Sequence, residues 1–78
     1  MIDKLLKLQG KSIEVFNCAG DIGLMYKHSE VSDPPFLVGA YGRGKTTEEA
    51  AEDYYNKISG RTLVFNSGTK QEERVIVL

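Results

Sequence analysis

The stretch FLVGAYGRGKTTEEAAEDYYNKI, residues 36–58, determines the architecture that this sequence predicts. An apolar run at residues 36–38 leads into a glycine-rich segment and then into residues typical of a helix. Thr46 and Glu49 have the capping-box spacing, so we expect the Thr46 hydroxyl to accept a hydrogen bond from the Glu49 amide, and the Glu49 carboxylate to accept one from the Thr46 amide. The predicted helix ends at Gly60, which favours a left-handed stop, and its apolar side consists of Ala50, Ala51, Tyr54, Tyr55 and Ile58.

Residues 39–46 fit the phosphate-loop pattern G-x-x-x-x-G-K-[ST]. A nucleotide hydrolase of that class needs a parallel sheet of several strand–helix–strand units and a further acidic strand for its metal, and 78 residues cannot hold both. A noncatalytic site is compatible with this length, because amides at the helix start, together with Arg43 and Lys45, would hold a phosphate or another anion. The predicted ligand-binding residues are Tyr41, Gly42, Arg43, Gly44, Lys45 and Thr46.

A purely structural interpretation of this segment stays open. Gly39, Gly42 and Gly44 would permit positive φ and close packing where the chain reverses into the helix. Glu48 and Glu49 also lie in the first helical turn, where each opposes a further negative charge by roughly 0.3–1 kcal/mol through the helix dipole.

Length and composition indicate one domain, residues 1–78, because 41% of the residues are apolar and 27% are charged. Cys18 is the only cysteine and His28 the only histidine, so we expect neither an intrachain disulfide nor a metal or cofactor. A net charge of −1 disfavours coating of nucleic acid. No signal peptide or membrane span is evident, so we expect a cytoplasmic protein, in the host cytoplasm if it is viral.

Hydrophobic periodicity predicts an α+β fold: a small antiparallel or mixed β-sheet of about five strands with one main helix. A short helix is expected at residues 2–8, and an antiparallel strand pair at residues 12–16 and 24–28, joined through a loop at 17–23. A polar loop follows at residues 29–35 and a third strand at 36–41. After the main helix, residues 62–66 and 74–78 form a final hairpin. The order is therefore helix, three strands, helix, two strands.

A family resemblance lies in Gly42, Gly44, Thr46, Glu49 and Ala50. A strand that enters a glycine-and-threonine turn and then a Glu-Ala-rich helix resembles the partial-RNase-H-like domain of HicB-type antitoxins, over roughly residues 36–60. The length and element order also resemble the short accessory proteins of phages and prophages. The final strand pair stands where those antitoxins carry a DNA-binding segment. The resemblance therefore implies a small partner-binding or ligand-binding module.

Other side chains suggest alternative sites. Cys18 could act as a nucleophile with His28 as its base, although a single cysteine is more often a buried apolar residue, and we expect no catalytic residues. Tyrosine rings beside basic residues suit stacking on a nucleobase, and Tyr41 is the candidate inside the glycine segment. On the helix, Glu48, Glu52 and Asp53 form either a solvated face or an acidic surface for a basic protein partner.

Two functions follow from these patterns. The first is a noncatalytic, phage-type accessory protein, of the kind that counters host defence, which binds an anionic small ligand such as a nucleotide through residues 41–46. The alternative is an inhibitor or antitoxin-like protein that binds a host protein through its acidic helix or an exposed sheet edge. Residues 75–78 are all apolar, so this last strand is either buried within the sheet or pairs with a second copy, and we expect a homo-oligomer.

Overall fold

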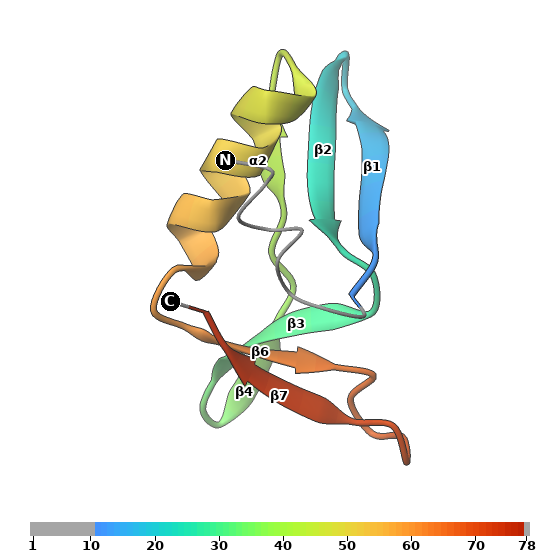
Figure 1. The fold of residues 1–78 in the computed structure, drawn as a ribbon, viewed down its shortest axis with the longest axis vertical. Coiled ribbons are helices and arrows are strands. Elements are labelled where there is room, and N and C mark those ends of the chain that lie inside the picture. Colours follow the sequence, from blue (N-terminus) through green and yellow to red (C-terminus); the bar gives the residue numbers. More distant parts are fainter. Residues whose placement is uncertain (1–10, 78) are drawn as a thin grey trace.

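The computed structural model describes residues 11–77, which form two antiparallel sheets and one helix (Figure 1). The predicted α+β class is confirmed, and the predicted helix at residues 2–8 lies outside the described residues. The elements are β1 (Ile13–Cys18), β2 (Asp21–Tyr26), β3 (Ser29–Asp33), β4 (Phe36–Val38), β5 (Gly42–Gly44), α2 (Thr47–Ile58), β6 (Thr62–Phe65) and β7 (Glu73–Ile76).

The first sheet has the strand order β1-β2-β5, with β1 antiparallel to β2 as predicted. The connection between them is tighter than the expected loop, because the strands extend until Cys18 pairs with Asp21. Only Ala19 and Gly20 remain in the turn, and both have positive φ, 50° and 90°. A two-residue turn of this kind matches the twist of the flanking strands.

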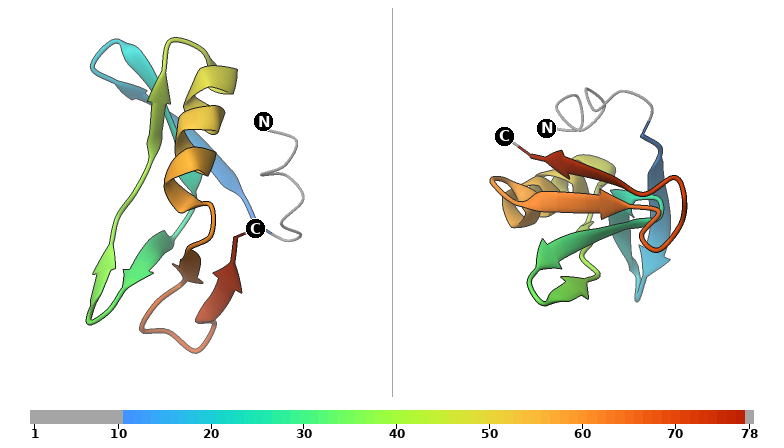
Figure 2. Two further views of the ribbon diagram at one scale, coloured as in Figure 1. Left: turned by 90° about the vertical axis from the view of Figure 1, so that its left-hand side faces the viewer. Right: turned by 90° about the horizontal axis from the view of Figure 1, so that it is seen from below.

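The second sheet has the order β4-β3-β6-β7 and contains the final hairpin that the sequence predicted. The predicted polar loop at residues 29–35 is wrong, because Ser29–Asp33 is strand β3. Its polar composition hid an alternation in which Ser29 and Val31 are buried and the other side chains are more exposed. Only the Pro34–Pro35 turn remains as loop, and Figure 2 shows the β3–β4 hairpin projecting beyond α2.

The predicted third strand, residues 36–41, is also wrong in extent. Residues 36–38 form β4 at the edge of the second sheet, whereas Gly42–Gly44 forms β5 at the edge of the first. The chain therefore runs from one sheet to the other through residues 39–41 (Figure 2).

The core lies where α2 and the two sheets meet. Tyr26, at the end of β2, is fully buried and makes edge-to-face contacts with Tyr54 of α2 and Phe65 of β6, each with ring centroids 5.7 Å apart. Burial raises the pKa of Tyr26, which keeps its phenol protonated. The other buried apolar residues in this cluster are Leu24, Val31, Ala50, Ala51, Ile58, Leu63 and Val77.

A closed cycle of buried hydrogen bonds braces the point where the chain leaves the first sheet for the second. The Tyr26 amide donates to the Tyr54 hydroxyl at 3.2 Å, and the Ser29 hydroxyl donates to the Tyr26 carbonyl at 2.8 Å. The Tyr54 and Ser29 hydroxyl oxygens are 3.4 Å apart. Because the Ser29 hydrogen is already engaged, Tyr54 is the donor to Ser29. The tyrosine hydroxyl is therefore enclosed in the core and not directed into water.

Candidate functional site

The centre of the segment that fits the phosphate-loop pattern, Gly42–Gly44, is β-strand β5 and not a loop. Gly42, Arg43 and Gly44 pair with Leu24, Gly23 and Ile22 of β2. The positive φ predicted for Gly39, Gly42 and Gly44 is absent, because the glycines with positive φ in residues 11–77 are Gly20, Gly60 and Gly68.

Close packing does explain two of these three glycines. A Cβ at Gly42 would overlap the Ala50 carbonyl oxygen and lie 2.5 Å from the Tyr54 amide nitrogen. A Cβ at Gly44 would lie 2.7 Å from the Ala50 amide nitrogen, whereas at Gly39 nothing lies within 4 Å. Strand β5 thus packs backbone to backbone against the first turns of α2.

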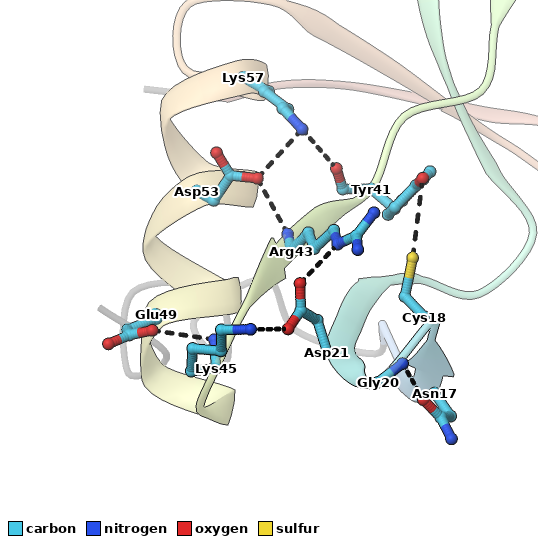
Figure 3. A network of polar contacts seen from close by, with 10 residues as sticks. All are labelled: Asn17, Cys18, Gly20, Asp21, Tyr41, Arg43, Lys45, Glu49, Asp53 and Lys57. Atoms are coloured by element: carbon cyan, nitrogen blue, oxygen red, sulfur yellow. Dashed lines mark hydrogen bonds and ion pairs between the residues drawn. The ribbon is translucent and has the colours of Figure 1, made fainter.

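Side chains of α2 bind the outer backbone edge of β5 (Figure 3). The Arg43 amide donates to Asp53 Oδ2 at 2.9 Å, and Lys57 Nζ donates to the Tyr41 carbonyl at 3.0 Å. Asp53 and Lys57 also form an ion pair at 3.0 Å. The first bond satisfies a backbone group that edge strand β5 would otherwise leave free, and the second satisfies the carbonyl of Tyr41, directly before β5.

Glu49 extends this arrangement to the end of β5. Its Oε1 accepts from the Lys45 amide at 2.9 Å, so the predicted bond to the Thr46 amide is displaced by one residue. The other half of the predicted cap is confirmed, because the Thr46 hydroxyl accepts from the Glu49 amide at 3.1 Å. The amides proposed to hold an anion are therefore occupied at Arg43, Lys45 and Glu49.

The two cations of the predicted site bind one carboxylate. Asp21, at the start of β2, accepts from Arg43 Nε at 2.8 Å and from Lys45 Nζ at 2.6 Å. These hydrogen bonds, from Lys45 first and Arg43 second, lower the pKa of Asp21. The hydrogen bond to Asp21 also raises the pKa of the Arg43 guanidinium. Asp21 thus offsets one of the two positive charges of Arg43 and Lys45 from within the fold.

Tyr41 lies beside this network. It is 41% exposed, its ring makes an edge contact with Phe16 at 5.6 Å, and Lys57 Nζ lies 5.7 Å from the ring centroid. Its hydroxyl is 3.9 Å from Cys18 Sγ. These neighbours occupy part of the ring that was predicted to stack on a nucleobase.

Cys18 and His28 are not brought together. Cys18 pairs with Asp21 at one end of β2, whereas His28 follows Tyr26 at the other end. A strand of six residues spans roughly 20 Å. The structure therefore does not place His28 where it could take a proton from the Cys18 thiol.

The acidic residues predicted to bind a partner, Glu48, Glu52 and Asp53, differ in their surroundings. Asp53 binds the Arg43 amide and Lys57, and these interactions, the amide first, lower its pKa. Glu48 and Glu52 are exposed. Of the predicted partner-binding set, Asp53 therefore has a structural role within the domain.

Strand β4 forms a surface that the sequence interpretation missed. Its three side chains are all exposed: Phe36 at 68%, Leu37 at 39% and Val38 at 46%. In residues 11–77 this strand pairs only with β3, so its outer backbone edge has no strand partner. The signal that could have identified it is an apolar run directly after a tight proline turn, at the outer end of a hairpin.

Within residues 11–77, strand β7, predicted to be central or intermolecular, lies at the opposite edge of the same sheet. Ile76 is exposed, whereas Val77, directly after β7, is buried and forms backbone hydrogen bonds with the residues that precede β6. The Val77 amide donates to the Arg61 carbonyl at 2.9 Å, and the Gly60 amide donates to the Val77 carbonyl at 2.7 Å.

Comparison with protein-family models, curated proteins and solved structures gave no significant match to this chain. Among residues 11–77 no helix has the length and apolarity to cross a membrane. The same residues contain no group of three or more His, Cys, Asp or Glu side chains arranged to hold a metal ion.

Proposed function

We propose that this protein is a noncatalytic protein-binding module that pairs β4 with an extended segment of a partner protein. The observation that carries the proposal is the contrast between two edge strands of one small domain. Glu49, Asp53 and Lys57 bind the outer backbone edge of β5 and of the residues directly beside it. Strand β4 has an open outer edge among the described residues and presents three exposed apolar side chains.

Strand addition matches the chemistry of this edge. Backbone groups of β4 would pair with the added strand, while its alternating side chains would pack against Phe36 and Val38 on one face and Leu37 on the other. Because β4 has only three residues, few backbone bonds form, and apolar contacts must supply much of the affinity. The partner segment should therefore be extended and apolar on both faces.

The other function expected from the sequence, binding of an anionic ligand by residues 41–46, has less physical support. Asp21 already offsets one of the two positive charges of Arg43 and Lys45, and the amides of these two residues already donate to Asp53 and Glu49. The phage-type setting and the HicB resemblance stay predictions from the sequence.

Photocrosslinking would test the proposal directly. A photoreactive phenylalanine analogue at position 37 should give an adduct with a distinct protein in cells that produce this chain, whereas the same analogue at position 52 should not. The partner identified by mass spectrometry would then be purified. Its binding to the wild type should be lost with Leu37→Lys, because a lysine on an edge strand opposes pairing, and should be retained with Glu52→Lys.

The reverse pattern, with loss of binding in Glu52→Lys alone, would assign the partner to the acidic helix and refute the role of β4. An adduct between two copies of this chain, with no other protein, would refute a heterologous partner.

A further inference from the structure

A basic depression is lined by no residue of strand β4 or β5. Its lining comes from three parts of the chain: the residues before β1, the turn between β2 and β3, and the end of β6. It has a volume of about 280 Å³ and is lined by Lys11, Ser12, Lys27, His28, Phe65 and Asn66. No motif in the sequence indicated this site, because its residues are separated by up to 55 positions.

Positive charges outnumber negative charges around this depression. Lys11 forms an ion pair with Glu73, and its Nζ lies 4.5 Å from the centroid of the Phe65 ring. Lys27 and His28 are exposed, and their side chains make no ion pair or hydrogen bond within residues 11–77. Two lysines against one carboxylate leave an excess of positive charge, which a bound anion would balance.

The backbone fixes the residues around the depression. His28 and Asn66 both have positive φ, 57° and 54°, and the Asn66 amide donates to the His28 carbonyl at 2.9 Å. The Lys27 amide donates to the Ser12 carbonyl, also at 2.9 Å. Histidine and asparagine are among the residues that adopt this left-handed conformation most readily, so both turns hold their side chains beside the depression without unusual strain.

A second depression, of about 330 Å³, shares His28 and Asn66 with the first. Its other lining residues are mostly neutral: Met25, Ser29, Ser67 and Thr69. Glu30 is its only charged lining residue, and this carboxylate accepts a hydrogen bond from Ser67 Oγ at 2.8 Å. The two adjoining depressions therefore differ in chemistry: the first has an excess of positive charge, whereas the second has a mostly apolar surface with some hydroxyl and amide groups and one carboxylate.

We propose that the basic depression binds the phosphate group of a small phosphate monoester whose uncharged, hydroxyl-bearing remainder lies toward the second depression. Lys27 supplies the ionic contact, and His28, Ser12 and Asn66 supply hydrogen-bond donors. The basic depression, of about 280 Å³, has room for a phosphate group, and the remainder of the ligand would occupy part of the second depression. This site is independent of the β4 edge.

Titration with glycerol 1-phosphate, followed by amide chemical shifts and calorimetry, tests the proposal. We expect saturable binding with shifts at His28 and Asn66, and none with glycerol alone. Lys27→Gln should weaken binding about tenfold or more, because a charge-assisted hydrogen bond is lost. His28→Asn should also weaken binding while keeping the backbone, since asparagine tolerates a left-handed conformation.

The matched controls are Lys70→Gln, an exposed lysine in the β6–β7 connection, and Lys45→Gln, from the phosphate-loop pattern. Both should bind glycerol 1-phosphate as the wild type does, and so should Leu37→Lys from the β4 edge. Equal weakening in Lys27→Gln and Lys70→Gln would show general charge attraction and overturn the site. Loss in Lys45→Gln alone would place the phosphate at β5 instead. Tighter binding of longer single-stranded oligonucleotides would point to a nucleic-acid surface and also overturn the proposal.

Discussion

Replacement of Tyr54 by phenylalanine should lower the free energy of unfolding by much more than removal of a surface hydroxyl would. The Tyr54 hydroxyl accepts from the Tyr26 amide and donates to Ser29, and all three residues are buried. The substitution leaves the Tyr26 N–H without its acceptor in the core, a penalty of about 1–3 kcal/mol. The aromatic packing against Tyr26 is retained, so this figure isolates the hydroxyl.

For a domain of this size, about 2 kcal/mol corresponds to a fall in melting temperature of roughly 8–16 °C. Thermal and urea unfolding, followed by circular dichroism, measure this quantity. Tyr41→Phe is the matched control, because its hydroxyl lies at the surface, and it should change stability by less than about 0.5 kcal/mol. Ser29→Ala combined with Tyr54→Phe should cost less than the sum of the single changes, since both belong to one cycle. Equal stability of Tyr54→Phe and Tyr41→Phe would refute the proposed cycle.

Three further predictions concern β5, pH and assembly. Gly42→Ala should destabilise the domain severely or prevent folding, because its Cβ would overlap the Ala50 carbonyl, whereas Gly39→Ala should fold normally; equal melting temperatures would contradict the close packing of β5 on α2. Asp53 has a lowered pKa in the folded state, so its stabilising effect is present above about pH 4, near the unfolded value, and is lost as the pH falls through the native pKa. Melting temperatures from pH 7 to pH 2.5 should therefore fall less in Asp53→Asn than in the wild type, and parallel curves would argue against this contribution. Light scattering at micromolar concentration should detect a homo-oligomer through the exposed edge at β7, with a melting temperature that rises with concentration; a strict monomer with a constant melting temperature would remove that prediction.

Local signals predicted the helix well. The Thr46 cap, the four buried positions of α2 and the positive φ at Gly60 follow from short-range chemistry that the sequence displays directly, whereas Tyr55, also predicted on the apolar side, is only partly buried. Only the target of the Glu49 carboxylate was wrong, by one residue. The final hairpin was also predictable, since its apolar runs and turn residues are adjacent in the sequence.

Long-range contacts explain what the sequence could not reveal. Strand β3 contains one strongly apolar residue, Val31, and becomes a strand because β4 and β6 pair with it on both sides. Residues 36–44 were assigned to one strand and a turn, because nothing local shows that they enter two different sheets. The ion pairs of Asp21 with Arg43 and Lys45 span more than 20 residues, so a local pattern that suggests an anion site could not show that both cations already bind a carboxylate of the fold.

The binding of α2 side chains to β5 has a geometric consequence. Four helical residues rise about 6.0 Å, and two residues of an extended strand advance about 6.6 Å. Glu49, Asp53 and Lys57 are four residues apart on α2 and therefore have nearly the same spacing as the backbone groups they bind, at residues 45, 43 and 41 of the extended segment. The two repeats differ by about 0.6 Å at each step, and the mismatch accumulates to more than 1 Å over three contacts. A straight helix can therefore substitute for a missing neighbour strand only along a few residues. If an insertion lengthened β5, the added residues would lie beyond the reach of the α2 side chains and would leave a new strand edge exposed. The helix therefore limits how long β5 can be unless another strand pairs with it.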